Sequence, residues 1–189
     1  MFLCQRKYAL DIIEECGLLG AKPVEFPIEE NHKLTLASGE ILNDAARYRR
    51  LVGILIYLTI TRLELTYAVH VLPQFMQSPK EEHMPAARRI LQYLKGSPGD
   101  DNLLYAKNNL QLYGFCDSDW GACPLSRRSL TGYFFSLGGS PISWKTKKQA
   151  TVSRSSAEAE YRAMGEATSE LVWWLSLLAS LGVFHSQPM

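Results

Sequence analysis

A turn-rich break at residues 96–102, with the sequence GSPGDDN, divides the chain into two halves of different character. Glycine, proline and aspartate disfavour the interiors of helices and strands, so we expect neither half to continue through the break. Before it, apolar residues recur with helical spacing, and after it short apolar and aromatic runs are bounded by turn residues. The pattern predicts a mixed α/β chain of the α+β kind, in which helices come first and a sheet follows.

Three principal helices are predicted between Asp44 and Lys95. Asp44 is suited to cap the first of them, because its side chain can accept a hydrogen bond from a backbone N–H. Pro73 should break or kink the middle helix. An earlier helix should end at Gly17, and the proline-containing segment 20–43 should form a long loop.

Beyond the break, strands are predicted at residues 103–106, 110–119, 129–139 and 141–149. The last two should form a hairpin through Gly138, Gly139, Ser140 and Pro141. A long helix should follow, close at Gly182, and cover one face of the sheet.

Bulk properties exclude several classes of protein. The formal charge of +1 is too small to attract the whole chain to a nucleic acid or to an anionic membrane. The most apolar region, residues 51–72, is interrupted by Arg62 and Glu64, and falls short of a membrane span. The N-terminus lacks the pattern of a signal peptide. The four cysteines lack metal-ligand spacing and are expected to be reduced, buried thiols.

Two glutamates open the predicted final helix, in the stretch SSAEAEYRAM at residues 155–164. Residues two apart on a helix point in different directions, so Glu158 and Glu160 should have different surroundings. Glu160 is expected to face the sheet, and Glu158 to face water. This expectation rests on an apolar stripe that begins at Glu160 and continues through Met164, Ala167, Leu171, Trp174 and Leu178.

Burial of a carboxylate costs free energy unless it is paired or bound to a metal ion. The predicted sheet supplies a second carboxylate that could share such an ion. Asp117 follows an apolar strand on the same side as Tyr113 and Phe115. Acids at the end of a strand and at the start of a helix lying on that strand can converge, and convergent carboxylates hold Mg²⁺ for phosphodiester cleavage. The simpler alternative is that Asp117 is a turn residue and that Glu160 only favours the helix dipole.

A basic stretch lies between the two carboxylates. Between Asp119 and Glu158 it contains no acidic residue and six basic residues, namely Arg127, Arg128, Lys145, Lys147, Lys148 and Arg154. Such a stretch beside a Mg²⁺ site suits the phosphate backbone of a nucleic acid. The alternative is the solvated rim of a hairpin.

The chain resembles the copia-type retrotransposon Pol polyprotein of plants over essentially its whole length. The motifs that carry the resemblance include YRRLVGILIYLTITR, GFCDSDW and RRSLTGYFFSLGGSPISWKTKKQATVSRSSAEAEYRAM. The resemblance implies that residues 1–100 are the thumb- or connection-like end of the reverse transcriptase region. It implies that residues 101–189 are the first part of a ribonuclease H-like domain, an incomplete β-β-β-α unit.

The resemblance assigns Asp117 to the first-strand aspartate of the ribonuclease H site and Glu160 to the glutamate of its first helix. The parent would carry out RNA-directed DNA synthesis and Mg²⁺-dependent hydrolysis of RNA in RNA–DNA hybrids. The expected partners are an RNA–DNA hybrid or other nucleic acid, bound weakly, and the remainder of the Pol polyprotein, with no membrane. The expected location is intracellular, in the cytoplasm (virus-like particle) or nucleus, without secretion.

The sequence also departs from the family pattern. It contains no Tyr-x-Asp-Asp motif of the polymerase, and it stops before the strand that carries the next ribonuclease H aspartate in the family. Asp117 and Glu160 would supply only part of the ligand set, so we expect no tight binding of Mg²⁺ and no cleavage by this chain alone. The alternative function is a non-catalytic retroelement remnant that binds nucleic acid or a protein partner.

Overall fold

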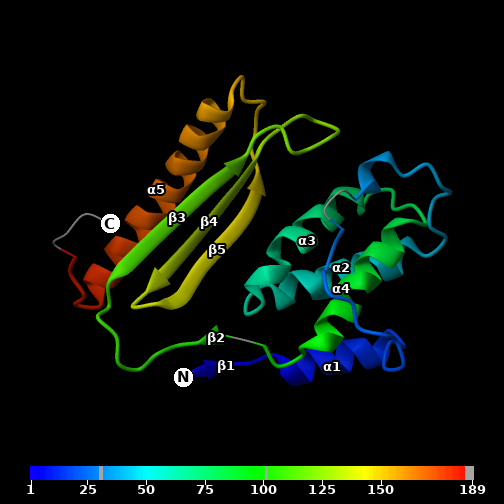
Figure 1. Cartoon of the computed structure of the whole chain (residues 1–189), viewed down its shortest axis with the longest axis horizontal. Coiled ribbons are helices and arrows are strands. Elements are labelled where there is room, and N and C mark those ends of the chain that lie inside the picture. Colours follow the sequence, from blue (N-terminus) through cyan, green and yellow to red (C-terminus); the bar gives the residue numbers. More distant parts are fainter. Residues whose placement is uncertain (30–31, 101, 186–189) are drawn as a thin grey trace. The chain divides into compact units, whose positions relative to one another are not determined.

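In the computed structural model the chain divides into two compact units (Figure 1). One unit is Phe2–Asn102, and the other consists of Met1 with Leu103–Met189. The structure describes residues 1–29, 32–100 and 102–185. Helices fill the first unit and an antiparallel sheet with one long helix forms the second, so the predicted α+β class is confirmed.

The described residues of the unit Phe2–Asn102 form four α-helices, which are α1 (Arg6–Glu15), α2 (Ala45–Leu58), α3 (Thr66–Val71) and α4 (His83–Gly96). The three helices predicted between Asp44 and Lys95 are confirmed. Asp44 accepts a hydrogen bond from the backbone N–H of Arg47 at 2.9 Å, which caps α2 as predicted. Short 3₁₀ turns join the helices at η1 (Leu34–Leu36), η2 (Leu63–Leu65) and η3 (Leu72–Phe75).

Pro73 lies in η3 and ends the regular part of α3, as the sequence predicts. The carbonyl of Leu72 beside it accepts a hydrogen bond from the hydroxyl of Tyr48 at 2.9 Å. Tyr48 is completely buried. The core around it is formed by apolar residues of all four helices, including Ile12, Ile13, Leu51, Leu55, Leu58, Ile90, Leu91 and Leu94.

The second unit contains a three-stranded antiparallel sheet in the order β3-β4-β5, made of β3 (Leu112–Asp119), β4 (Leu130–Leu137) and β5 (Ser140–Lys148). The hairpin between β4 and β5 turns at Gly138 and Gly139, whose φ angles are 55° and 81°. A two-residue turn with positive φ at both positions matches the right-handed twist of the strands and favours glycine.

The strand predicted at residues 103–106 is mostly wrong. Outside the sheet, strand structure is limited to the short β1 (Phe2–Leu3) and β2 (Asn102–Leu103) among the described residues. The backbone N–H of Tyr105 donates to the Ser140 hydroxyl at 3.0 Å, so a side chain takes the place of a neighbouring strand.

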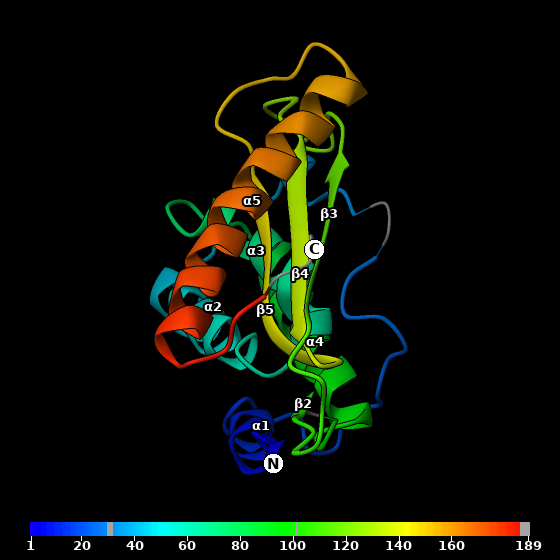
Figure 2. The same cartoon turned by 90° about the vertical axis from the view of Figure 1, so that its left-hand side faces the viewer.

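Helix α5 (Ser156–Ser180) lies along one face of the sheet, where it packs on β3 and β4 (Figure 2). Gly182 follows it with a φ of 82°, as the sequence predicts. Gly114 of β3 faces the helix, because a Cβ built there would lie 3.5 Å from Leu171 and 2.5 Å from the ring of Phe135. Glycine at this position leaves room for both side chains.

Candidate functional site

Asp117 lies on β3 and is exposed. Side chains alternate between the two faces of a strand. The neighbouring Ser118 is buried and faces α5, where it accepts a hydrogen bond from Gln149. Asp117 therefore projects from the opposite face of the sheet, the face that also carries Tyr113 and Phe115.

Glu160 lies on α5 beside the row of residues closest to the sheet. That row consists of Ala159, Ala163 and Ala167, all of which are buried. Glu160 is half-buried at its flank, and Met164 is 50% exposed. The apolar stripe predicted to begin at Glu160 and Met164 is therefore wrong at its start. Alanines allow the first turns to lie close to the sheet, and this part of the helix is rotated by about one residue from the predicted orientation, whereas Ala167 and Leu178 are buried as predicted.

Glu158 has a local role at the start of α5. Its backbone N–H donates to the Ser155 hydroxyl at 3.1 Å, and its carboxylate accepts the backbone N–H of Arg154 at 2.7 Å. This arrangement is close to a capping box. The carboxylate also pairs with Arg162 at 2.8 Å. The hydrogen bond from Arg154, and then Arg162, hold the pKa of Glu158 below its ordinary value.

Burial and the charges of both candidate carboxylates influence the pKa of the Cys116 thiol. Cys116 lies directly before Asp117 on β3 and is half-buried. Burial raises the pKa of its thiol, and the negative charges of Glu160 and Asp117 raise that pKa further. Both carboxylates are therefore near enough to this thiol to influence it. Among the described residues, neither Asp117 nor Glu160 has a hydrogen bond or an ion pair through its carboxylate.

Gln149 is a residue that the sequence analysis did not single out. It follows β5, is 2% exposed, and joins β3, β4 and α5 through its side-chain amide. The two N–H donors of the amide are shared among three oxygens, namely the hydroxyl of Ser118 at 3.2 Å, the hydroxyl of Thr131 at 3.1 Å and the carbonyl of Ala159 at 2.9 Å. The amide oxygen accepts a hydrogen bond from the Ser153 hydroxyl at 3.0 Å. No local sequence pattern predicts such a residue, because all its side-chain hydrogen-bond partners belong to other strands, helices or loops.

The six basic residues do not gather on one surface of the sheet. The register places Lys147 opposite Thr131, whose hydroxyl faces α5, and Lys147 pairs with Glu166 of α5 at 3.3 Å. By alternation Lys145 lies on the same face and Lys148 on the other. The remaining three lie in the loops before β4 and α5, namely Arg127, Arg128 and Arg154.

The ammonium group of Lys148 donates a hydrogen bond to the sulfur of Cys123 at 3.2 Å. Burial by itself raises the pKa of this thiol, but the polar groups of Ser126 and the positive charge of Lys148 outweigh burial and lower the pKa to about 7. All four cysteines are free thiols, as predicted, but only Cys123 is buried, since Cys16 and Cys116 are half-buried and Cys4 is exposed, so the prediction that all four are buried is wrong for the other three.

Comparison with known proteins decides the family. The Pol polyprotein from transposon RE1 of Arabidopsis thaliana, described as retrovirus-related, is 44% identical over 100% of this chain and 13% of its own length. Its counterpart from transposon TNT 1-94 of Nicotiana tabacum is 34% identical over 99% of this chain and 14% of its own length. An uncharacterised mitochondrial protein of Arabidopsis thaliana is 39% identical over 92% of this chain and 72% of its own length. The chain belongs to the copia-type retrotransposon Pol family.

No protein-family model and no solved structure matches this Pol segment. The segment spans 13% and 14% of the length of the two Pol relatives. The assignment of its two units to the reverse transcriptase and ribonuclease H regions stays a prediction.

The carboxylates of Asp117 and Glu160 fit Mg²⁺ in kind, because this ion prefers oxygen ligands. They are few in number. Among the residues that the structure describes, no group of three or more His, Cys, Asp or Glu residues could hold a metal ion. That the two carboxylates contribute to one metal site stays a prediction.

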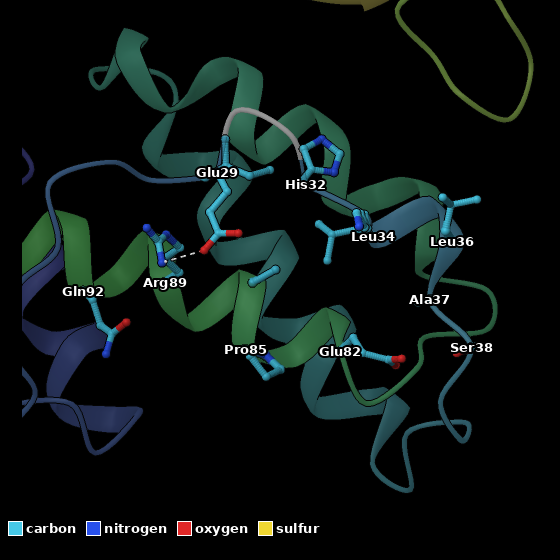
Figure 3. A pocket seen from close by; sticks show the side chains of 13 residues that line it. Glu29, His32, Leu34, Leu36, Ala37, Ser38, Glu82, Pro85, Arg89 and Gln92 are labelled. Carbon is cyan, nitrogen blue, oxygen red and sulfur yellow. Dashed lines mark ion pairs between the residues drawn. The ribbon is translucent and has the colours of Figure 1, made fainter.

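A cavity of about 520 Å³ lies in the unit Phe2–Asn102, between the loop that precedes α2 and one face of α4 (Figure 3). Arg89 of α4 reaches across it to pair with Glu29 at 3.3 Å, and Glu82 accepts the backbone N–H of Gly39 at 2.8 Å. Burial lowers the pKa of His32 in its wall. The cavity contains none of the predicted site residues.

The apolar run at residues 51–72 is divided in the structure among α2, η2, α3 and the start of η3. Within the described ranges, no helix has the length and apolar character needed to cross a membrane.

Proposed function

We propose that this Pol segment contributes two metal-binding carboxylates to a ribonuclease H site that cleaves the RNA strand of an RNA–DNA hybrid. The observation that carries the proposal is the place of the two acids in a β-β-β-α unit, with Asp117 on β3 and Glu160 in the first turns of α5, which packs on β3. The two acids come from a strand and from the helix that packs on it, as the resemblance implies, and Asp117 projects from the face of the sheet opposite that helix.

In this proposal Asp117 and Glu160 bind Mg²⁺ through their oxygens. When bound, the ion would polarise the phosphate and lower the pKa of water, so that hydroxide is available near neutral pH. The residues of this chain hold the carboxylates in place, while the exposed Arg127, Arg128 and Lys145 attract the phosphate backbone. Two acids hold Mg²⁺ poorly, so we expect cleavage only when further acids of the Pol polyprotein complete the site.

The role proposed for the unit Phe2–Asn102 is that of a thumb- or connection-like support in RNA-directed DNA synthesis by the parent Pol polyprotein. The proposed partners are the remainder of that polyprotein and, weakly, an RNA–DNA hybrid. The proposed location is inside the cell, in a cytoplasmic particle or in the nucleus.

A second candidate function, a non-catalytic binding module, is favoured by one feature of the sheet. On the face opposite α5, the rings of Tyr113 and Phe115 are 46% and 63% exposed. Strand β3 is also an edge strand of the sheet. An exposed aromatic face next to a free strand edge can bind a partner protein or stack on nucleic-acid bases.

The experiment that tests the proposed function uses paired variants in a completed domain. This chain is joined to the segment that follows the matched region in the RE1 relative, and cleavage of a labelled RNA–DNA hybrid is measured with Mg²⁺. We expect Glu160→Gln to abolish cleavage, because it removes a metal ligand while keeping the shape of the side chain. Glu158→Gln should have little effect, because its amide oxygen can still accept the N–H of Arg154.

Two outcomes would contradict the proposal. If the completed domain carrying native Asp117 and Glu160 does not cleave the hybrid, the binding-module function is favoured. If Glu158 is essential and Glu160 dispensable, the assignment of the metal ligand is wrong.

A further inference from the structure

The amide of Gln149 forms hydrogen bonds to residues next to both candidate carboxylates. Ser118, which accepts one of these bonds, directly follows Asp117 on β3, and Ala159, whose carbonyl accepts another, directly precedes Glu160 on α5. One buried side chain thus bonds to a strand residue and to a helix residue that each lie one position from a predicted metal ligand.

The first turns of α5 are held on the sheet by buried alanines and, at their flanks, by the contacts of Arg162 with Thr151 and of Glu166 with Lys147. The row closest to the sheet consists of Ala159, Ala163 and Ala167, whose side chains are single methyl groups without hydrogen-bonding atoms. Each residue of an α-helix corresponds to a rotation of about 100°, so a rotation by one residue in either direction would change the position of Glu160 relative to β3. The hydrogen bond from Gln149 to the carbonyl of Ala159 opposes such a rotation.

We propose that Gln149 is a positioning residue, which fixes the rotation of the first turns of α5 on β3 and so holds Glu160 in place relative to Asp117. An uncharged amide suits this task, because its two N–H donors and its oxygen, which accepts from Ser153, connect strand, helix and loop without bringing a charge into a buried site. This inference rests on the proposed function for its catalytic meaning. The positioning itself can be measured without activity.

The test uses the full 189-residue chain with Gln149→Met, which keeps the length of the side chain and removes its hydrogen bonds. Gln111→Met is the matched control, because Gln111 lies in the same unit and its side chain forms no hydrogen bond within the described residues. Amide hydrogen exchange is followed by NMR. We expect protection factors to fall by about tenfold or more at Ala159 and Ala163, with little change in β4 and in the second half of α5.

A uniform loss of protection across the sheet and the whole of α5 would overturn the inference, because Gln149 would then be a general stabiliser. Unchanged protection at Ala159 would overturn it as well. Gln149→Glu provides a conditional rescue. At pH 5 a buried glutamic acid is protonated and can donate to the carbonyl of Ala159, whereas at pH 8 it is ionised and cannot. Protection of the first turns should therefore be near normal at pH 5 and lost at pH 8, and the absence of this difference would count against the inference.

Activity gives an independent readout in the completed domain. There Gln149→Met should lower kcat by about ten- to a hundredfold, since a small displacement of a catalytic group has effects of this size. The KM for the hybrid should be unchanged, because the basic side chains are untouched. If the domain with native Gln149 does not cleave, the proposed function fails, and the exchange experiment still decides whether Gln149 positions α5. An unchanged kcat in an active domain would overturn the inference.

Discussion

Substitution of Tyr48 by phenylalanine tests how much the hydrogen bond to the carbonyl before Pro73 stabilises the helical unit. The Tyr48 hydroxyl donates to the carbonyl of Leu72 at 2.9 Å, and the side chain is 0% exposed. Tyr48→Phe removes this donor and leaves the ring in place. The carbonyl of Leu72, which immediately precedes the proline, would then lose this partner in the interior.

The expected loss follows from the burial of both groups. A buried acceptor left without a partner costs about 1 to 3 kcal/mol, and we take about 1.5 kcal/mol for this carbonyl. For a unit of roughly 100 residues, each kcal/mol lowers the midpoint of thermal unfolding by about 4 to 8 °C, so Tyr48→Phe should lower Tm by about 6 to 12 °C.

Thermal unfolding followed by circular dichroism measures this shift. Tyr57→Phe is the matched control, because Tyr57 lies on the same helix, is 52% exposed, and should change Tm by only a degree or two. Equal effects of the two substitutions would refute the importance assigned to the buried hydrogen bond.

The same variant changes the response to alkaline pH. Burial raises the pKa of Tyr48 above its ordinary value of 10.0, so the unfolded chain loses this proton more readily than the folded chain. The contribution of Tyr48 to stability is therefore complete below pH 10 and is lost as the pH rises above it. In Tyr48→Phe this part of the alkaline loss should be absent, and an identical alkaline loss in both proteins would contradict the assigned burial.

Two further predictions concern charged groups of the sheet unit. The rate of alkylation of Cys123, measured by mass spectrometry as a function of pH, should reach half its maximum near pH 7. Lys148→Met should move this midpoint toward the ordinary pKa of 9.0, whereas Lys145→Met should not. A midpoint unaffected by Lys148→Met would contradict the role of the ammonium group. Replacement of Lys145, Lys147 and Lys148 by glutamine should reduce the salt dependence of hybrid binding by up to about one unit for each phosphate that is no longer neutralised by a lysine. An unchanged salt dependence would assign these lysines to a solvated rim.

Several features of the fold could be predicted from the sequence because they depend on neighbouring residues. Asp44 caps α2 through a residue three positions away, and Gly138 with Gly139 turns the hairpin through its own φ angles. Pro73 ends the regular part of α3 because it lacks an N–H. Such preferences act within one turn of chain, so the sequence alone carries them.

The candidate site was predictable only in part. The sequence pattern and the family resemblance indicated Asp117 and Glu160, and separated Glu160 from Glu158. The apolar count gave the wrong residues for the start of the buried row on α5, because it rated Met164 as a core residue. In the structure the closest row is made of alanines, since the distance between helix and sheet favours small side chains there.

What the sequence determined by itself is the order of helices and strands, their caps and turns, and the carboxylates worth testing. The tertiary structure alone decided the rotation of α5, the separation of the lysines onto two faces, and the place of Gln149. The physical reason is distance along the chain. Gln149 is 31 residues from Ser118 and 10 from Ala159, and hydrogen bonds over such separations form only when packing brings the elements together.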